Sequence, residues 1–448
     1  EFDPIGPVVP KGGAADGQAG TSGDDMYEVD NPDDQIIEQA NGGTDTVRST
    51  ANYTLGANLE NLDLAGMALN AAGNALNNVL RGNAFDNVLS GEGGVDTYEG
   101  GVGDDAYYDY ADRSLVTDQA TVIEREGEGY DTLITNSTSV DMADHLEALE
   151  IRYADVRAAT PMDGYDYRYV GNDLDNLIDV SPARFDRTGV QPVRVLVDGG
   201  EGADRMVSAS GWFTFVVDNE GDVVDASPLS RGEVVASVSY TLSDQHLVLR
   251  LTGGEAISAT GDSGANTLDG TRNLVANRLI GKLGNDTYLV DLGDEVVEAA
   301  SGGTDTVVLH ALGGEAPDVV ELGRYANVEA LRIDDDLGDA ALLGTAGADG
   351  LTGNAGNNRI EGLAGNDTLV GGGGDDVLLG GAGNDTLQLG AGSSLVDGGT
   401  GNDTIVAGGS QLQVLLSMDG GADTVGGAAA RSAAQWYVQR EVRSFIAL

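Results

Sequence analysis

The run from Gly344 to Val406 divides into seven blocks of nine residues that stay in one phase throughout. The fourth residue of every block is glycine, and the eighth is always leucine, isoleucine or valine. Composition alone does not produce such regularity, so the run predicts a repeated structural unit. The sixth residues of the blocks are, in order, Asp349, Asn358, Asp367, Asp376, Asp385, Ser394 and Asp403.

The nonapeptide G-G-x-G-x-D-x-U-x is a signature of the parallel β-helix. Glycine permits the positive φ that a tight turn needs, and each x-U-x triplet can form a short strand with one side chain directed inward. Two blocks then make one coil of about eighteen residues, and coils stack at about 4.8 Å. We therefore expect an all-β fold, a parallel β-roll or β-helix solenoid of Gly-Asp nonapeptide repeats interspersed with longer β modules, with a short C-terminal cap helix.

Such a roll needs a cation to hold it together. One buried aliphatic side chain per block contributes about 2 kcal/mol, whereas ordering the backbone costs about 1–2 kcal/mol for each residue. Stacked carboxylates about 4.8 Å apart also repel by roughly 3–4 kcal/mol at an effective dielectric near 20. A Ca²⁺ ion between turns converts this repulsion into attraction. Ca²⁺ suits the site because carboxylate and carbonyl oxygens can bind it in a flexible coordination shell, whereas Mg²⁺ requires a stricter octahedron.

The predicted calcium ligands of this run are the first, third and sixth residues of every block except the one that carries Ser394. If blocks two apart stack, Ser394 weakens one edge of the roll, and the other edge should hold calcium better. The ligands are Gly344, Ala346, Asp349, Gly353, Ala355, Asn358, Gly362, Ala364, Asp367, Gly371, Gly373, Asp376, Gly380, Ala382, Asp385, Gly398, Thr400 and Asp403.

At these residues the chain resembles the RTX (repeats-in-toxin) proteins. The resemblance implies a calcium-binding β-roll that is exported by type I secretion and folds outside the cell. It also implies an uncleaved secretion signal in the last stretch, where the apolar ending Phe445-Ile446-Ala447-Leu448 resembles such signals. In the same stretch, helical spacing relates Val438, Val442, Phe445 and Ile446, which predicts the cap helix.

The strongly negative net charge limits which classes of molecule the chain can bind. The 448 residues include 23 basic and 74 acidic side chains, a net charge of −51, which excludes nucleic acid and anionic membranes as favourable partners. Such acidity alone would predict disorder, yet 41% of the residues are hydrophobic and recur periodically, so a cation-dependent fold is expected. The chain has no cysteine and no apolar run of transmembrane length. Its first residues do not form a signal peptide, so it could begin inside a longer protein.

A longer repeat occurs three times before the regular run. It contains a D-x-Y triplet, then a glutamate followed seven residues later by an aspartate, and then a strand of the form apolar-Glu-x-Leu-x-apolar. The constant spacing of seven predicts that glutamate and aspartate share one cation, although a solvated strand end is the alternative. The predicted ligands are Asp25, Glu38 and Asp45; Asp105, Glu124 and Asp131; and Asp286, Glu298 and Asp305. The strand glutamates Glu60, Glu147 and Glu329 are expected to face solvent or to pair with arginine.

Further nonapeptides connect these copies. Blocks in phase from Gly73 to Tyr108 add the ligands Asn87 and Asp96, and single blocks add Asp204 and, in a degenerate turn, Asp423. The expected organisation is a flexible lead-in at 1–20, RTX module 1 with nonapeptides at 21–108, RTX module 2 at 109–207, a diverged metal-poor module 3 at 208–280, RTX module 4 at 281–343, the regular calcium β-roll at 344–409, and the C-terminal cap with secretion signal at 410–448.

No catalytic constellation is evident. The three histidines are not arranged as H-E-x-x-H, no G-x-S-x-G elbow opens a helix, and the run Gly261-Asp262-Ser263-Gly264 falls inside a nonapeptide. We therefore expect no enzyme. The aromatic groups around Tyr167 and Phe213 are expected in the core, with a carbohydrate-binding face as the alternative.

Two functions remain open at this stage. The first is a secreted structural protein of the cell surface, such as a surface-layer, adhesin or matrix component. Its expected partners are calcium, further copies of itself in a lattice or filament, or cell-surface polysaccharide. The second is the C-terminal calcium-folding and secretion region of a larger RTX toxin or exoenzyme. Both place the chain outside the cell or at the bacterial cell surface.

Overall fold

The computed structural model describes residues 15–110, 120–152, 165–183, 193–208, 210–243, 248–311, 317–406, 415–416, 422–426 and 437–438. The chain divides into two compact units, Glu1–Val234 and Val235–Leu448. The division falls inside the segment predicted as the diverged module, and the other predicted module boundaries stay predictions. Within the described residues the elements are β-strands and two short 3₁₀ turns, η1 (Leu322–Arg324) and η2 (Asp335–Leu337). The all-β prediction is therefore confirmed.

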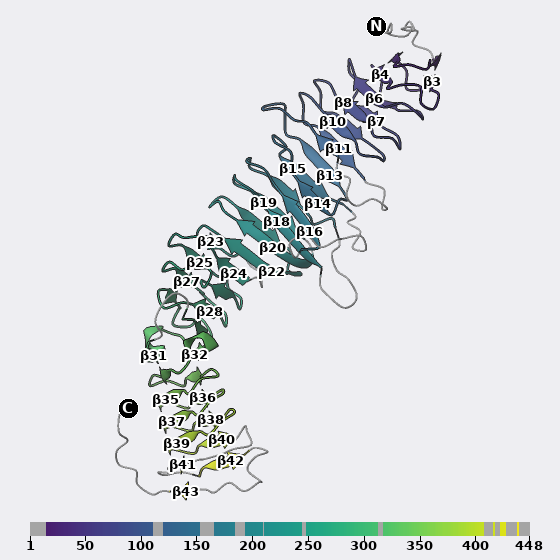
Figure 1. The fold of residues 1–448 in the computed structure, drawn as a ribbon. Coiled ribbons are helices and arrows are strands. Elements are labelled where there is room, and N and C mark those ends of the chain that lie inside the picture. Colours follow the sequence, from purple (N-terminus) through teal and green to yellow (C-terminus); the bar gives the residue numbers. More distant parts are fainter. Residues whose placement is uncertain are drawn as a thin grey trace. The chain divides into compact units, whose positions relative to one another are not determined.

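The first unit is a stack of parallel rungs (Figure 1). One ladder contains β2 (Met26–Val29), β4 (Thr46–Ser49), β6 (Asn61–Leu64), β8 (Val79–Arg81), β10 (Thr97–Glu99) and β12 (Thr121–Val122). A second contains β5 (Tyr53–Thr54), β7 (Asn70–Ala72), β9 (Val88–Ser90), β11 (Ala106–Asp109), β13 (Thr132–Thr135), β15 (Ala148–Ile151), β17 (Leu177–Asp179), β19 (Arg205–Ser208) and β21 (Val223–Ala226).

Further parallel strands of this unit are β14 (Ser139–Asp141), β16 (Tyr167–Val170), β18 (Arg194–Asp198) and β20 (Gly211–Val217). The pair β1 (Gly17–Ala19) and β3 (Gln35–Ile37) lies in the same unit, so part of the predicted lead-in forms a strand. The strand β22 (Ser230–Ala236) spans the division between the units.

The second unit repeats the arrangement. One series of strands is β24 (Val248–Leu251), β26 (Thr267–Asp269), β28 (Thr287–Val290), β30 (Thr306–Leu309), β32 (Ala330–Ile333), β34 (Gly350–Thr352), β36 (Thr368–Val370), β38 (Thr386–Gln388), β40 (Thr404–Val406) and β42 (Thr424–Gly426). The others are β23 (Tyr240–Thr241), β25 (Ser258–Thr260), β27 (Arg278–Ile280) and β29 (Glu295–Val297), then β31 (Val319–Glu321), β33 (Ala341–Leu343), β35 (Arg359–Ala364), β37 (Val377–Ala382) and β39 (Leu395–Thr400).

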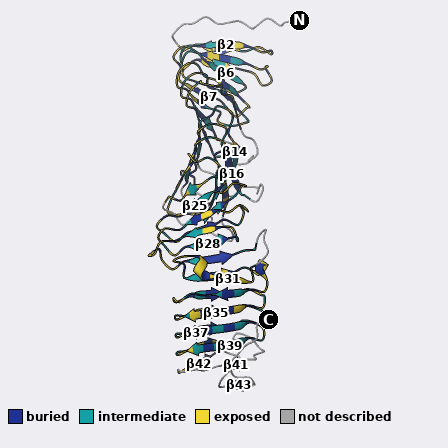
Figure 2. Ribbon diagram, turned by 90° about the vertical axis from the view of Figure 1, so that its left-hand side faces the viewer, coloured by how far each residue is buried: buried dark blue, intermediate teal, exposed yellow. Residues whose placement is uncertain are grey.

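Strand register confirms the eighteen-residue coil. Leu351 pairs with Leu369, which pairs with Leu387, so blocks two apart lie directly on one another. The intervening blocks form the facing sheet, where Ile360 pairs with Leu378. The five eighth-position side chains just named are fully buried. Buried positions alternate with more exposed ones along the strands (Figure 2). The aliphatic column is therefore the core of the roll.

The aromatic residues near the middle of the chain pack inward. Tyr167 and Tyr169 stack with ring centroids 6.4 Å apart, and Phe213 stacks on Phe215 at 5.5 Å. All four rings are buried, whereas Trp212 is 47% exposed. The expectation of core packing is confirmed for these four residues.

The C-terminal prediction falls largely on residues outside the described part. The exception is β43 (Tyr437–Val438), which pairs in parallel with β41 (Leu415–Leu416). At these two residues the helix prediction is wrong, because Val438 continues a parallel ladder instead of a helical turn. Within the described residues, no helix is long and apolar enough to cross a membrane.

Candidate calcium sites

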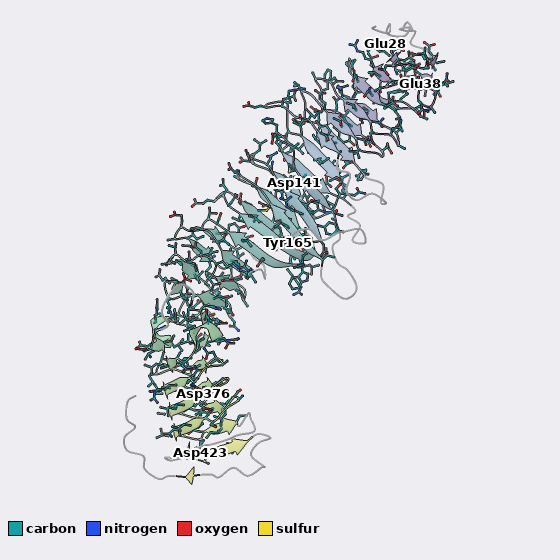
Figure 3. The ribbon with its side chains drawn as sticks, in the orientation of Figure 1. Glu28, Glu38, Asp141, Tyr165, Asp376 and Asp423 are labelled. Carbon is teal, nitrogen blue, oxygen red and sulfur yellow. The ribbon has the colours of Figure 1, made fainter. Side chains whose placement is uncertain are left out.

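The sixth-position aspartates of the regular run form a hydrogen-bonded ladder along one edge of the roll. The backbone N–H of Asp349 donates to Asp367 Oδ1 at 2.9 Å, and the N–H of Asp367 donates to Asp385 Oδ1 at 2.8 Å. The same contact joins Asp385 to Asp403 and Asp403 to Asp423, at 2.9 Å each. Figure 3 draws the side chains as sticks and labels Asp376 and Asp423. Each of these carboxylates thus uses one oxygen to fix the preceding turn.

The second oxygens of Asp367, Asp385 and Asp403 are buried without a hydrogen-bond partner. Within the described residues this holds for ten carboxylate groups, and all ten belong to residues that the sequence predicts as metal ligands. They are Asp45, Asp105, Glu124, Asp204, Asp286, Asp305, Asp367, Asp376, Asp385 and Asp403. A buried polar atom without a hydrogen-bond partner is costly, so these oxygens are suited to bind a cation.

Burial raises the pKa of several ladder aspartates. Desolvation, with a smaller contribution from Asp385 and Asp349, raises the pKa of Asp367 to about 6, against the opposing hydrogen bond from the Asp349 N–H. The pKa of Asp204 is raised to about 7 in the same way, with Asp222 as the main repelling neighbour. The raised pKa values mean that burial disfavours the charged form of these carboxylates, a cost that a bound cation would offset.

The first glycine of each block leaves the space into which these oxygens point. A Cβ placed on Gly362 would lie 2.3 Å from Asp367 Oδ2 and 2.6 Å from the carbonyl oxygen of Gly380 in the next coil. A Cβ on Gly380 would meet Asp385 Oδ2 and the Gly398 carbonyl, each at 2.5 Å. A carboxylate and a carbonyl of successive coils therefore converge beside each glycine, which fits a hard, oxygen-binding cation such as Ca²⁺.

The predicted carbonyl ligands lie in these same turns. Of the third-position carbonyls, Ala382 accepts the N–H of Gly365 and Thr400 accepts that of Gly383, each at 2.8 Å. Each keeps a second lone pair for an ion. Metal binding by these carbonyls stays a prediction, as it does for those of Gly344, Ala346, Gly353, Ala355, Gly362, Ala364, Gly371, Gly373, Gly380 and Gly398.

The opposite edge of the run is interrupted, as the sequence predicts. Asn358 donates its N–H to Asp376 Oδ1 at 2.9 Å, but the next sixth residue in register is Ser394, which has no carboxylate. The calcium filling of the two edges stays a prediction.

The first unit contains similar ladders. Asn87 donates to Asp105 Oδ1 at 2.6 Å, and Asn78 donates to Asp96 Oδ1 at 2.8 Å. Asp204 accepts from Asn176 at 2.7 Å and itself donates to Asp222 at 2.9 Å. The sequence reasoning missed Asp222, whose signal is the turn Asp218-Asn219-Glu220-Gly221 before it. Both Asp218 and Asn219 donate their N–H to its Oδ2.

The long repeats build a different kind of site. In the first copy, Asp25, Glu38 and Asp45 are all buried, and each offers a ligand oxygen within 4.8 Å of the others. In the last copy the same is true of Asp286, Glu298 and Asp305. In these two copies the structure therefore brings together the glutamate and aspartate that the spacing of seven linked, and it places the predicted aspartate of D-x-Y beside them.

The tyrosine of D-x-Y belongs to these clusters as well, which the sequence reasoning missed. The hydroxyl of Tyr27 donates to Glu38 Oε2, and that of Tyr288 donates to Glu298 Oε2. In the middle copy Tyr107 donates to Glu124, which lies beside Asp105 and Asp131. Burial, the neighbouring aspartates and Glu128 raise the pKa of Glu124 to about 8, against the lowering effect of its hydrogen bond with Tyr107.

The strand glutamates differ from expectation. They neither face open solvent nor pair with arginine. Instead, their carboxylates accept the backbone N–H of the cluster aspartate one coil away. The contacts are Asp45 to Glu60 at 2.9 Å, Asp131 to Glu147 at 2.8 Å and Asp305 to Glu329 at 2.9 Å. Each long repeat thus continues its aspartate ladder with a glutamate.

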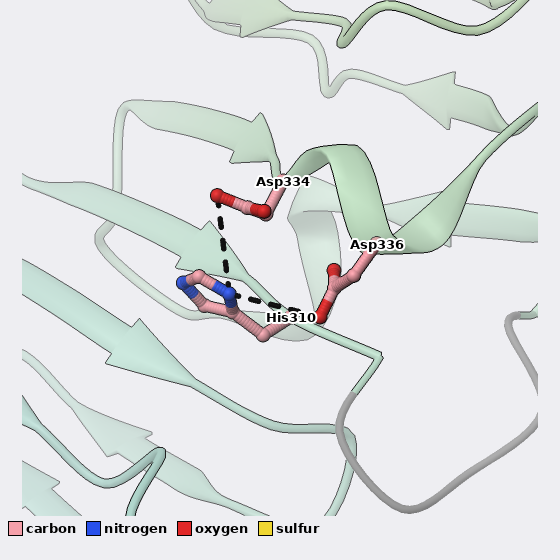
Figure 4. Close-up of side chains that lie close together, drawn as sticks. All are labelled: His310, Asp334 and Asp336. Carbon is pink, nitrogen blue, oxygen red and sulfur yellow. Dashed lines mark ion pairs between the residues drawn. The ribbon is translucent and has the colours of Figure 1, made fainter.

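A separate group contains a histidine. His310 Nδ1 lies 3.9 Å from Asp334 Oδ2 and 3.8 Å from Asp336 Oδ2 (Figure 4). The group is partly exposed, and both oxygens of Asp336 accept the N–H of Ala311. It contains no buried unpartnered ligand atom, so it differs from the calcium-type clusters and we assign it no ion.

The fold and the acidic turns define the class: a parallel β-roll whose turns direct oxygen ligands toward a shared hard cation. A family model described as the RTX calcium-binding nonapeptide repeat (4 copies) matches residues 72–107, 343–378 and 379–410. No curated protein sequence matches the chain. With these repeats and this solenoid, the chain is an RTX β-roll protein.

Proposed function

We propose that this RTX protein is secreted, folds on calcium after export and has a structural, non-enzymatic role at the cell surface. The observation that carries the proposal is the set of ten buried carboxylates, each with one unpartnered oxygen directed into the turns. Without a cation, these groups oppose the packing of successive coils. With calcium, the same groups join the coils.

Calcium concentration then acts as the signal for folding. Extracellular calcium modules bind at about 10⁻⁴–10⁻³ M, well above cytosolic levels. Because binding free energy at sites formed only in the fold is also folding free energy, the chain would stay unfolded inside the cell and fold outside. A net charge of −51 adds self-repulsion that favours the unfolded state before calcium is met.

A structural role fits the distribution of the candidate sites. They repeat along both units, inside turns, and they stabilise the roll itself instead of converging on one pocket. The alternative, a calcium-folding and export region of a larger toxin or exoenzyme, uses the same sites. Electron microscopy of the calcium-loaded protein separates the two, because ordered arrays or filaments support the structural role.

Far-UV circular dichroism tests the calcium-dependent step. We expect a largely disordered spectrum in EDTA and a β spectrum in millimolar Ca²⁺, with Mg²⁺ at the same concentration much less effective. A spectrum that shows the same β content in EDTA and in calcium would contradict the proposal.

A further inference from the structure

Three buried clusters differ from the nonapeptide turns in their ligands. We call them the Tyr-Glu clusters: Tyr27 with Asp25, Glu38 and Asp45; Tyr107 with Asp105, Glu124 and Asp131; and Tyr288 with Asp286, Glu298 and Asp305. Ligand oxygens converge within 4.8 Å in the first and third clusters, whereas the second is joined by the Tyr107–Glu124 hydrogen bond and by the Asp105 N–H donated to Asp131 Oδ1. Each combines aspartates of two successive coils with a glutamate that lies between them in sequence. A nonapeptide turn, in contrast, offers one unpartnered aspartate oxygen per coil together with carbonyl oxygens.

The clusters concentrate negative charge where no side-chain cation compensates it. Asp45, Asp131 and Asp305 are less than 2% exposed. Within the described residues, none of the ion pairs formed by arginine or histidine includes a cluster carboxylate. A fourth carboxylate lies next to each cluster, because Glu60, Glu147 or Glu329 accepts the N–H of its last aspartate.

Unpartnered oxygens point to a ligand at each cluster. Asp45 Oδ2 is buried without a partner in the first cluster, as are Asp105 Oδ2 and Glu124 Oε2 in the second and both Asp286 Oδ2 and Asp305 Oδ2 in the third. The first glycine of the block provides the space, since a Cβ on Gly281 would lie 2.3 Å from Asp286 Oδ2 and 2.5 Å from Glu298 Oε2.

The tyrosine positions the glutamate. Its hydroxyl, at the eighth position of the block, donates to one glutamate oxygen. The other oxygen accepts the N–H of the next residue in Glu38 and Glu298, and it is unpartnered in Glu124. Tyr98 occupies the same block position without such a partner. Its hydroxyl accepts the N–H of Gly91 and donates to the Tyr108 carbonyl. The glutamate, and not the tyrosine alone, therefore distinguishes the three clusters.

We propose that the three Tyr-Glu clusters form a second, tighter class of calcium site, which fills before the nonapeptide turns. This inference rests on the proposed calcium-dependent folding and deepens it. Affinity for Ca²⁺ rises with the number of charged ligands and with site rigidity. Three carboxylates held by backbone N–H and tyrosine O–H donors exceed the nonapeptide turns on both counts. Calcium would then order the long repeats first and the regular run afterwards.

Direct calcium-binding measurements on the full chain test this order. The variant Glu38→Gln/Glu124→Gln/Glu298→Gln removes one carboxylate from each cluster and keeps the side-chain size. We expect the wild type to show two classes of ions by isothermal titration calorimetry, and the variant to lose the tighter class, with affinity at those sites at least about ten-fold weaker. The weaker class should remain.

A matched variant controls for the loss of three charges. Glu28, Glu150 and Glu295 are strand glutamates outside the clusters, and each is paired with an arginine. Glu28→Gln/Glu150→Gln/Glu295→Gln should titrate as the wild type does. If the cluster variant fails to fold, the single variant Glu298→Gln still decides the question, because it should lose one tight ion.

The outcomes separate this inference from the proposed function. A wild type that binds calcium in a single class insensitive to Glu298→Gln overturns the inference and leaves calcium-dependent folding intact. A wild type that binds no calcium overturns both. Loss of the weaker class instead of the tighter one in the cluster variant would reverse the proposed order.

Discussion

Leu363 occupies the second position of its nonapeptide with a φ of 75°, a region that side-chain-bearing residues rarely adopt. The second positions of three other blocks in the run are glycines with positive φ, namely Gly372, Gly381 and Gly399. A non-glycine residue there costs about 1 kcal/mol or slightly more. Leu363 is also 44% exposed, so it gains little from packing.

Leu363→Gly should therefore stabilise the calcium-loaded protein. The relief of strain is partly offset by the greater freedom of glycine in the unfolded chain, which leaves a gain of roughly 0.5–1 kcal/mol. Urea denaturation at fixed calcium measures it. Leu363→Ala is the matched control, because it shortens the side chain but keeps the Cβ, and it should give no gain. Equal stabilisation by both variants would mean that the gain comes from removing the exposed leucine side chain and not from relief of backbone strain.

At the scale of the strand and turn, the two edges of the regular run differ. The edge with Asp367 and Asp385 is a continuous ladder, whereas Ser394 leaves the N–H of Asp376 without the carboxylate that its counterparts have. Ser394 is buried in the same register as those aspartates.

Ser394→Asp should complete the weaker edge. The new carboxylate would accept the Asp376 N–H and supply a ligand, so we expect about one additional calcium ion per chain and a lower calcium midpoint for folding. Equilibrium dialysis counts the ions. The neighbouring substitution Ser393→Asp adds the same charge outside the sixth position and should change neither value. An unchanged ion count for Ser394→Asp would refute the predicted difference between edges.

The strands of the solenoid could be predicted from the sequence because one nine-residue repeat places both the core side chain and the candidate ligand. The eighth-position aliphatic residues mark each rung, and the fixed spacing of seven revealed pairs such as Glu298 and Asp305. The tyrosine partners were hidden because the separation between tyrosine and glutamate varies, from 10 residues for Tyr288 to 17 for Tyr107. The C-terminal expectation erred at Val438 because apolar spacing alone cannot distinguish a helix from one more parallel rung.

For the molecule as a whole, calcium and protons compete for the same carboxylates. The unfolded-chain pKa of aspartate is near 3.9, and burial raises the folded-state pKa of Asp45, Asp131 and Asp286 to about 6 and that of Asp105 to about 7. Neighbouring carboxylates add to the rise. Without calcium, the folded state therefore binds more protons than the unfolded chain between about pH 4 and 7.

The sign of the pH effect then depends on calcium. Without the ion, stability contributed by these groups is present at about pH 4 and is lost as the pH rises through 6 to 7. With the ion, acidification protonates the ligands, so the affinity for calcium should fall roughly ten-fold or more between pH 7.5 and 5.5. Calcium titrations followed by circular dichroism at both pH values measure this shift.

A variant shows whether the buried carboxylates cause the shift. Asp105→Asn removes the proton acceptor whose folded-state pKa lies near 7 and should flatten the pH dependence of the calcium midpoint, while it raises that midpoint at pH 7.5. Asp104→Asn, at the exposed neighbouring position, should change the pH dependence much less, because the Asp104 charge makes only a small contribution to the raised pKa of Asp105. A calcium midpoint that does not change between pH 7.5 and 5.5 in the wild type would exclude these carboxylates as the ligands that drive folding.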